Sequence, residues 1–414
     1  MIDIEQMMPE SPKSVSSIPW KKNLWIIFFA QMTTMIGFSS FFPFLPFYIE
    51  SIGKISNLKM EFLIGLVFSS QAFTMMIASP FWGALSDQYG RKLMVVRAMI
   101  GGSVILTLMA FARSAEELVL LRAIQGLITG TVGAANALVA ASVPKKKIGY
   151  AMGVLQVGMG IGVAIGPLIG GVVADMLGYR SVFFVTGATL FISGVTVFLG
   201  VTENFKKPEK SKKGALNFLP EWRHVLKAKG VVTTFCLRFS NQLGRIIFVP
   251  ILPLFVQSII GEDAKVNTFT GMVVGLSSAT MTLSSIYLAN LGDRIGHRKI
   301  VIAASLSCGL FLALQVYVTS GWHLLVLQAL FGICLGGIVP GISALLSDYT
   351  CLGEEGAVYG LDSSITACAR TIAPLLGVGI FMWLGIGSVF GAAALLYLIA
   401  GLIALIKLPR PGKH

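Results

Sequence analysis

The stretch Gly153–Gly171, GVLQVGMGIGVAIGPLIGG, places glycines at intervals of four residues within an apolar run long enough to cross a bilayer. In a helix these glycines share one face and leave a groove along it, and they are Gly158, Gly162, Gly166 and Gly170. Small residues let helices in lipid approach backbone to backbone, because close packing drives association there. Pro167 removes one backbone donor and is expected to bend or loosen the helix. The stretch therefore predicts a transmembrane helix at a close-packed, moving interface.

The composition is that of a polytopic membrane protein. Of the 414 residues 55% are hydrophobic and only 12% are charged, with a mean hydropathy of +0.80, whereas a soluble domain has roughly 25% charged residues. The net charge is +13, and the basic residues that produce it lie between apolar runs. They therefore indicate membrane orientation rather than nucleic-acid binding. The five cysteines form no CxxC pair, the four histidines are scattered, and ATP-binding and zinc-hydrolase motifs are missing from the sequence. We therefore expect no enzymatic activity, no cofactor and no metal.

The chain divides into twelve apolar spans, each near the ~20 residues that cross a ~30 Å hydrocarbon core. Their approximate limits are 24–49, 62–84, 93–112, 116–140, 149–175, 181–201, 231–258, 268–291, 300–319, 322–347, 357–384 and 387–406. Basic residues concentrate in the connections predicted to lie inside, while the outer connections carry only Lys54, Lys59, Arg113, Arg180 and Lys265. This asymmetry predicts that both termini are cytoplasmic.

Two bundles are expected on either side of the one long internal connection. The predicted division is a cytoplasmic tail 1–22, a six-helix bundle 23–201, a linker 202–230, a six-helix bundle 231–407 and a tail 408–414. Within the linker Leu219, Trp222, Val225 and Leu226 share one helical face, which predicts an amphipathic helix on the cytoplasmic surface.

The two halves repeat each other. Pro46 returns as Pro253, an offset of 207, and Asp87 returns as Asp293, an offset of 206. The same spacing relates Pro43 to Pro250, Gly126 to Gly332 and Pro167 to Pro374. Two six-span units that both enter from the cytoplasm are parallel repeats about an axis along the membrane normal, an arrangement that places a substrate site between them.

Residues 83–92, GALSDQYGRK, resemble the cytoplasmic loop motif of the major facilitator superfamily at every fixed position, and with the repeats the resemblance covers nearly the whole chain. It implies an all-α fold of twelve transmembrane helices in two pseudo-symmetric bundles. It also implies a latch between the bundles on the inner side, formed by Gly83, Asp87, Gly90, Arg91 and Lys92, with Asp293 in the second copy. Because that copy has Ala289 for Gly83 and His297 for Arg91, we expect a weaker latch there.

The glycine-rich stretch also resembles the fifth-helix antiporter motif of drug:proton antiporters in this superfamily. The matching positions are Gly153, Gly162, Gly166, Pro167, Gly170 and Gly171. By this resemblance the chain would exchange protons for substrate. The alternative is a glycine-rich packing helix with no bearing on the direction of transport.

Two residues are candidates for proton coupling. Arg122, in LLRAIQGLITG, resembles a fourth-span arginine that the family links to coupling, and a charge inside a span indicates a role by default. Asp362 is the only clear carboxylate inside a predicted span. The alternative for Arg122 is that it ties helices together without taking part in proton transfer.

Candidate substrate contacts lie mainly in the second half. Arg238 and Arg245 are seven residues apart, so they share one helical face ~10 Å apart, and Asn241 and Gln242 lie between them. Further candidates are Arg370, Gln71 and Asn136. A cavity rich in arginine should favour anions or zwitterions. Alternatively, Asp362 neutralises one arginine and the others bind backbone carbonyls.

Similarity to the drug:proton antiporter-1 family, specifically its twelve-span multidrug-resistance proteins, implies proton-coupled efflux of amphipathic small molecules by alternating access. The expected setting is the inner (plasma) membrane as a multi-pass monomer, with small-molecule substrate, protons and lipid as partners. The alternative is a dedicated transporter of an organic anion, such as a carboxylate siderophore or a phosphorylated metabolite. A receptor or scramblase on the same scaffold is a third reading.

Overall fold

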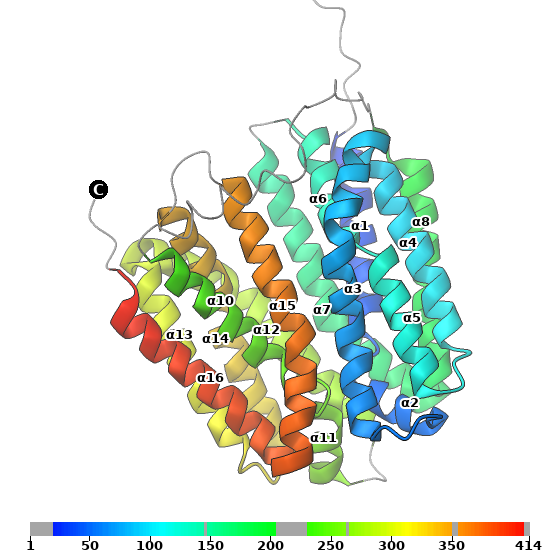
Figure 1. Cartoon of the computed structure of the whole chain (residues 1–414). Helices are drawn as coiled ribbons and strands as arrows, with labels where there is room; N and C mark the ends of the chain where they lie inside the picture. The colour runs from blue at the N-terminus through cyan, green and yellow to red at the C-terminus, as the bar shows by residue number, and fades with distance from the viewer. Residues whose placement is uncertain (1–19, 145–146, 204–229, 262–264, 350–354, 410–414) are drawn as a thin grey trace, which may run out of the picture.

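The computed structural model describes residues 20–144, 147–203, 230–261, 265–349 and 355–409, and all of its regular elements are helices (Figure 1). The predicted amphipathic helix and most of both tails lie outside these residues. The helices of the first half are α1 Trp20–Ser39, α2 Leu45–Ile52, α3 Met60–Tyr89, α4 Arg91–Met109, α5 Ala115–Ile128, α6 Thr131–Ser142, α7 Ile148–Leu177 and α8 Tyr179–Gly200. Those of the second half are α10 Val231–Ile246, α11 Leu252–Ile260, α12 Val266–Ile295, α13 His297–Gln315, α14 Gly321–Tyr349, α15 Glu355–Leu384 and α16 Ile386–Lys407.

Ten stretches of the described chain are helical, long and apolar enough to cross a membrane. They correspond to ten of the expected spans. The other two, 24–49 and 231–258, are each divided into a longer and a shorter helix, α1–α2 and α10–α11. Pro46 and Pro253 lie in the first turns of the shorter helices, where a missing backbone N–H breaks no helical hydrogen bond.

The expected span 116–140 is also divided, but by a glycine. Gly130 separates α5 from α6 with a φ of +137°, a conformation that residues with a side chain rarely adopt. In contrast, α7 runs continuously through Pro167. The predicted loosening at Pro167 therefore does not interrupt the helix, since packing in the surrounding seam supports it.

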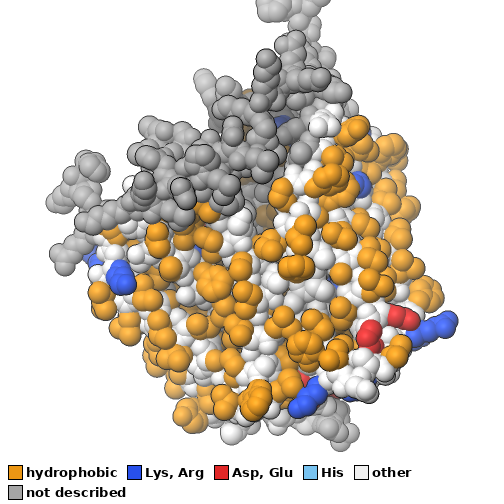
Figure 2. All heavy atoms as spheres, in the orientation of Figure 1, with side chains coloured by type: hydrophobic (Ala, Val, Ile, Leu, Met, Phe, Trp, Pro, Cys, Tyr) orange, Lys and Arg blue, Asp and Glu red, His pale blue; other side chains and the backbone are white. Residues whose placement is uncertain are grey.

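Each half contains its own hydrophobic core. One core is formed by buried residues between Leu24 and Val201, and the other by buried residues between Val231 and Leu408. In Figure 1 the helices of the first half stand beside those of the second. Apolar side chains cover most of the described surface in Figure 2, and charged ones lie near its two ends, as expected for a surface that faces lipid.

The glycine groove of α7 holds a helix of its own half. A Cβ at Gly158 would meet the ring of Phe28, and a Cβ at Gly170 would overlap the carbonyl of Ser40, so the groove receives the segment that begins with α1. The second half is met by another face of α7, where a Cβ at Gly171 would overlap the carbonyl of Asn267 in α12. The expected close-packed seam is thus present, but the helix in it belongs to the same half of the chain.

The two halves meet along two helix pairs, α7 with α12 and α3 with α15. Where α7 ends and α12 begins, Asp175 joins them. Its carboxylate accepts hydrogen bonds from Asn267 Nδ2 at 2.6 Å, from Thr268 N at 2.8 Å and from Thr268 Oγ1 at 2.6 Å. A carboxylate is well placed at the positive N-terminal end of a helix, so this contact holds the halves together at that end.

Candidate functional site

Two helices of the second half bring four of the predicted site residues together. Arg238 and Arg245 project from α10, while Asp362 and Arg370 project from α15, and these helices pack against each other. The seven-residue spacing places the two α10 arginines on one face, as predicted from the sequence. The result is a cluster of three arginines and one carboxylate.

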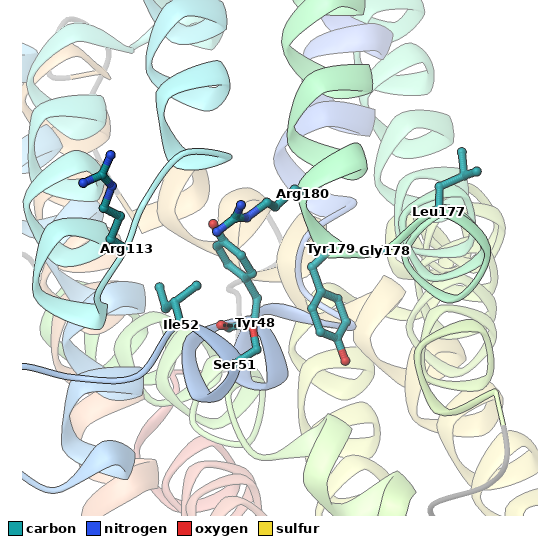
Figure 3. A pocket seen from close by; sticks show the side chains of 8 residues that line it. All are labelled: Tyr48, Ser51, Ile52, Arg113, Leu177, Gly178, Tyr179 and Arg180. Carbon is teal, nitrogen blue, oxygen red and sulfur yellow. Dashed lines mark hydrogen bonds between the residues drawn. The ribbon is translucent and has the colours of Figure 1, made fainter.

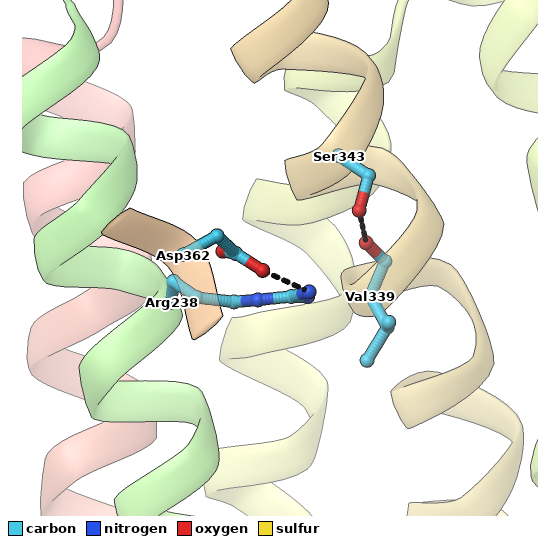
Figure 4. Close-up of polar contacts among 4 residues, drawn as sticks. All are labelled: Arg238, Val339, Ser343 and Asp362. Atoms are coloured by element: carbon cyan, nitrogen blue, oxygen red, sulfur yellow. Dashed lines mark hydrogen bonds and ion pairs between the residues drawn. The ribbon is translucent and has the colours of Figure 1, made fainter. Parts of the chain in front are cut away.

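One arginine of the cluster is ion-paired. Arg238 Nη2 lies 2.8 Å from Asp362 Oδ2, and Figure 4 shows the two side chains meeting between their helices. In the same view the hydroxyl of Ser343 in α14 donates to Val339 O of its own helix at 3.1 Å. Arg238 Nε and Asp362 Oδ1 are buried without a hydrogen-bond partner. Each member of the pair therefore keeps polar capacity for another group.

The other two arginines have no carboxylate partner among the described residues. Arg245 Nη1 lies 4.0 Å from Met281 Sδ, a weak contact for a cation. Arg370 is exposed, although it lies midway along α15, and its charge is near those of Arg238 and Arg245. Three guanidinium groups and one carboxylate give the cluster a net positive charge, which attracts an anionic group.

Uncharged amides complete this part of the site. Asn241 and Gln242 are buried, and their amide nitrogens Nδ2 and Nε2 have no hydrogen-bond partner. Tyr397, on α16, donates its hydroxyl proton to the carbonyl of Asn241 at 3.1 Å and so fixes this turn of α10. Buried donors without an acceptor are costly, and a ligand with acceptor atoms would satisfy them.

A second polar centre lies in the first half, around Arg122. Its Nη1 donates to Gln71 Oε1 at 3.2 Å and to Gln125 Oε1 at 2.9 Å. The guanidinium carbon lies 3.9 Å from the ring centroid of Phe41, and only 2% of the residue is exposed. Arg122 is thus stabilised by amide oxygens and an aromatic face, without a carboxylate among the described residues.

The two predicted coupling residues therefore have separate partners. Arg122 binds Gln71 and Gln125 within the first half, whereas Asp362 binds Arg238 within the second. Asn136 is half-buried in α6, a helix that packs on α1, α4 and α7. The structure thus joins Gln71 to Arg122 but does not join Asn136 to either centre.

Two polar residues within the spans were not among the candidates from the sequence. Gln125 is a direct partner of Arg122 three residues further along α5, a spacing that places both on one face. Arg97 lies inside a predicted span, with its guanidinium carbon 3.3 Å from the ring centroid of Trp82 and its Nε and Nη1 unpaired. The signal was available for Arg97, because any charge within a span marks a candidate site.

The predicted gate motif occupies the turn between α3 and α4. Gly90 adopts a φ of +97°, a backbone conformation that favours glycine. A Cβ at Gly83 would meet open space, so close approach of another helix does not explain the glycine at that position. The side chain of Asp87 lies outside the described residues. The amides of Arg91 and Lys92 donate to Glu203 at 3.0 and 2.9 Å, so Glu203 caps α4.

All described bonds of the two gate copies stay within their own half. Arg91 Nη1 donates to Ala137 O at 3.3 Å. In the second copy Asp293 Oδ1 lies 2.9 Å from His297 Nε2, and Arg298 donates to Leu405 O and Leu408 O, at 2.7 and 3.1 Å. The basic residues of each copy thus tie the start of one helix to neighbouring segments.

Comparison with known proteins agrees with this architecture. The family model of the Major Facilitator Superfamily matches residues 27–264 and 234–414. The chain is 34% identical to the multidrug resistance protein MdtG of Enterobacter lignolyticus, over 96% of this chain and 95% of that one, and 34% identical to MdtG of Salmonella typhimurium, over 93% and 94%.

Solved structures with low sequence identity share the fold. The nucleoside transporter NupG aligns with a TM-score of 0.79 at 15% identity, over 94% of this chain and all of that one. The human organic anion transporter MFSD10 aligns with a TM-score of 0.65 at 19% identity, over 93% and 99%. With the family model matching almost the whole described chain, the protein belongs to the major facilitator superfamily.

Proposed function

We propose that this protein exports amphipathic small molecules of the multidrug type by alternating access, driven by inward proton flow. The observation that carries the proposal is the 34% identity to multidrug resistance proteins over almost the full length of both chains. The described helices support it, because each half has its own hydrophobic core and the halves touch along two helix pairs, α7–α12 and α3–α15. Rocking of residues 24–201 against 231–406 requires two such separate bodies.

The proposed topology has twelve spans in two six-helix bundles, with both termini in the cytoplasm of a bacterial cell and the protein in its inner membrane as a monomer. Counting α1–α2 and α10–α11 as one broken span each adds two to the ten candidate spans. Broken helices at membrane depth are tolerated where they are covered by protein. Their pairing at an offset of 207 supports two equivalent bundles.

Coupling is assigned to Asp362 and Arg122. Protonation of Asp362 would remove its charge and release Arg238 from the 2.8 Å ion pair, so proton binding and exposure of a free guanidinium would occur together. Arg122, held by Gln71 and Gln125 in the first bundle, is the second coupling candidate. Substrate contacts are assigned to Arg238, Asn241, Gln242, Arg245 and Arg370, with Gln71 and Asn136 in the first bundle.

A dedicated organic-anion transporter is the second candidate, and a specific observation favours it. Arg245 and Arg370 have no carboxylate partner in the described part of the chain, and Arg370 is exposed. Two free guanidinium groups in one site suit a carboxylate or phosphate. The two candidate functions differ in the role of the arginines. They bind the substrate in the organic-anion transporter and have a structural role in the multidrug exporter.

Uptake into inside-out vesicles with an imposed acidic interior distinguishes the two candidates. A lipophilic cationic dye and a radiolabelled polycarboxylate are compared, with and without collapse of the pH gradient. Accumulation of the dye that disappears with the gradient supports multidrug export. Accumulation of the polycarboxylate alone identifies an anion exporter, and accumulation of neither contradicts both.

A further inference from the structure

A cavity of about 510 Å³ lies in the first half, away from both polar centres. It is formed where α2, the connection between α4 and α5, and the start of α8 come together, and its lining includes Tyr48, Ser51, Arg113 and Arg180 (Figure 3). These segments lie at the end of the bundle opposite Arg91 and Lys92. In the proposed topology, this is the end at the outer leaflet.

Two positive charges in this cavity are not neutralised by a described carboxylate. Arg113 and Arg180 are both exposed, and neither forms an ion pair among the described residues. The Arg180 guanidinium lies beside the Tyr48 hydroxyl, which donates its proton to Met109 O at 2.7 Å. An anion in the cavity would therefore meet two available guanidinium groups.

The nearby carboxylates are engaged elsewhere. Glu116 accepts from the amides of Ile55 and Ser56, and Glu117 accepts from the amide of Arg113, while Asp175 binds α12. The charges of Glu50 and Asp175 lie near the hydroxyl of Tyr179. That hydroxyl points away from the Arg180 guanidinium in Figure 3. Among the described residues none of these carboxylates forms an ion pair with the guanidinium of Arg113 or Arg180.

The internal repeat carries no arginine at the positions equivalent to Arg113 and Arg180. Offsets of 206 and 207 relate Arg113 to Thr319 or Ser320, and Arg180 to Ile386 or Gly387. Neither region of the second half has a charge at the equivalent place. A pair of arginines found in one repeat only is better explained by a ligand than by the scaffold.

An exposed aromatic pair lies close in sequence to the two arginines that line the cavity. Phe111 is 61% exposed and Phe184 is 40% exposed, and their ring centroids are 5.3 Å apart in an edge-to-face arrangement. Phe111 precedes Arg113 by two residues, and Phe184 lies one turn beyond Arg180. Apolar surface beside a cationic cavity matches a molecule with a charged head and hydrocarbon chains.

We propose that this cavity binds an anionic phospholipid of the outer leaflet. Its phosphate lies between Arg113 and Arg180, and its acyl chains lie against Phe111 and Phe184. Guanidinium groups suit phosphate because they offer several donors in a fixed plane. The same chemistry would accept a soluble phosphate, but the exposed aromatic pair favours the lipid.

Native mass spectrometry of the detergent-purified full chain tests the site with three probes: phosphatidylglycerol, phosphatidylcholine and glycerol phosphate. The unmodified chain should retain phosphatidylglycerol over phosphatidylcholine. The Arg113→Gln/Arg180→Gln variant should lose about fivefold in retention for each arginine, the effect expected of one basic residue near an anionic surface. The matched control Lys59→Gln/Lys265→Gln removes two exposed charges from the same end and should change nothing.

A second variant separates the sources of the anion. Phe111→Ser/Phe184→Ser leaves both guanidinium groups in place and should weaken phosphatidylglycerol retention. Equal retention by the arginine variant, or an equal loss in the lysine control, would overturn the site. Binding of glycerol phosphate as tight as that of phosphatidylglycerol would overturn the lipid and identify a soluble anion instead. Retained binding by Arg113→Lys/Arg180→Lys shows that a loss in the glutamine variant is one of charge rather than of folding.

Discussion

Arg238 Nη2 and Asp362 Oδ2 are 2.8 Å apart and connect α10 to α15 in the second bundle. The side chains are 17% and 12% exposed, so the pair is largely shielded from water. Arg238 in turn lies near Arg245 and Arg370, which have no carboxylate partners among the described residues. A change of charge at Asp362 therefore alters the whole cluster.

Asp362→Asn is expected to abolish transport driven by a pH gradient while substrate binding remains. The amide keeps the shape of the carboxyl group but can neither carry a proton nor neutralise Arg238. Leaving that guanidinium unpaired should cost about 1–3 kcal/mol of stability. Gradient-driven uptake into vesicles and equilibrium binding to the purified protein measure the two effects separately.

The double variant Asp362→Asn/Arg238→Gln serves as the control for this prediction. If the pair is only structural, removal of both charges should restore stability and driven transport together. Driven transport by Asp362→Asn alone would remove Asp362 from the coupling mechanism.

Much of the fold was predictable from the pattern of apolar spans. The ten candidate spans follow from length and hydropathy, and Pro46 and Pro253 mark where the broken helices resume. The breaks between α1 and α2 and between α10 and α11 were not predicted, because hydropathy stays high across them. Gly130 was equally hidden, since a glycine acts as a hinge only when its backbone adopts a positive φ.

The site was predictable in its residue types and less so in its contacts. A charge within a span singles out Arg122, Arg238 and Asp362 without any structure. Which of them pair depends on helix packing, and the structure pairs Arg238 rather than Arg122 with Asp362. The cap on α4 by Glu203 was also hidden, because it joins residues more than 100 positions apart.

Arg122→Gln is expected to fold and to lose proton coupling. The buried guanidinium has only amide and aromatic partners, so its removal relieves a desolvation cost and should leave stability unchanged or raised by about 1–4 kcal/mol. The second half offers a precedent, because Gln328 stands at the equivalent position and donates to Gln315 at 3.0 Å. Thermal unfolding and gradient-driven uptake are the measurements.

Gln328→Arg is the reciprocal control. It adds a charge to a position that is 2% exposed and should destabilise the protein by several kcal/mol. Strong destabilisation by Arg122→Gln, with Gln328→Arg tolerated, would contradict this account of both positions.

Gly170→Ala and Gly153→Ala should have opposite effects, although both glycines match the antiporter motif. A Cβ at Gly170 overlaps the carbonyl of Ser40, whereas a Cβ at Gly153 meets nothing within 4 Å. The first change should therefore destabilise by about 1–3 kcal/mol. The second should stabilise by up to about 1 kcal/mol through helix propensity. Thermal unfolding in detergent compares them, and a similar decrease for both would refute the packing argument.

Asp175→Asn is expected to favour separation of the two halves at the end where α7 meets the start of α12. The carboxylate accepts three hydrogen bonds from Asn267 and Thr268, and the amide would keep only part of them and lose the charge. A change of about 1–3 kcal/mol in this equilibrium alters the ratio of closed to open states about 5- to 150-fold. Spin labels at Leu177→Cys and Lys265→Cys, in a chain without its native cysteines, report the distance between the halves.

Glu117→Gln is the matched control for this last measurement. Glu117 is a carboxylate at the same end of the molecule, but its described bond, to the amide of Arg113, stays within the first half. The variant should therefore leave the label distances unchanged, while Asp175→Asn adds a longer population. If both variants lengthen the distance, the effect is one of net charge at this end. If neither does, the helix packing around Gly171, rather than Asp175, holds α7 against α12.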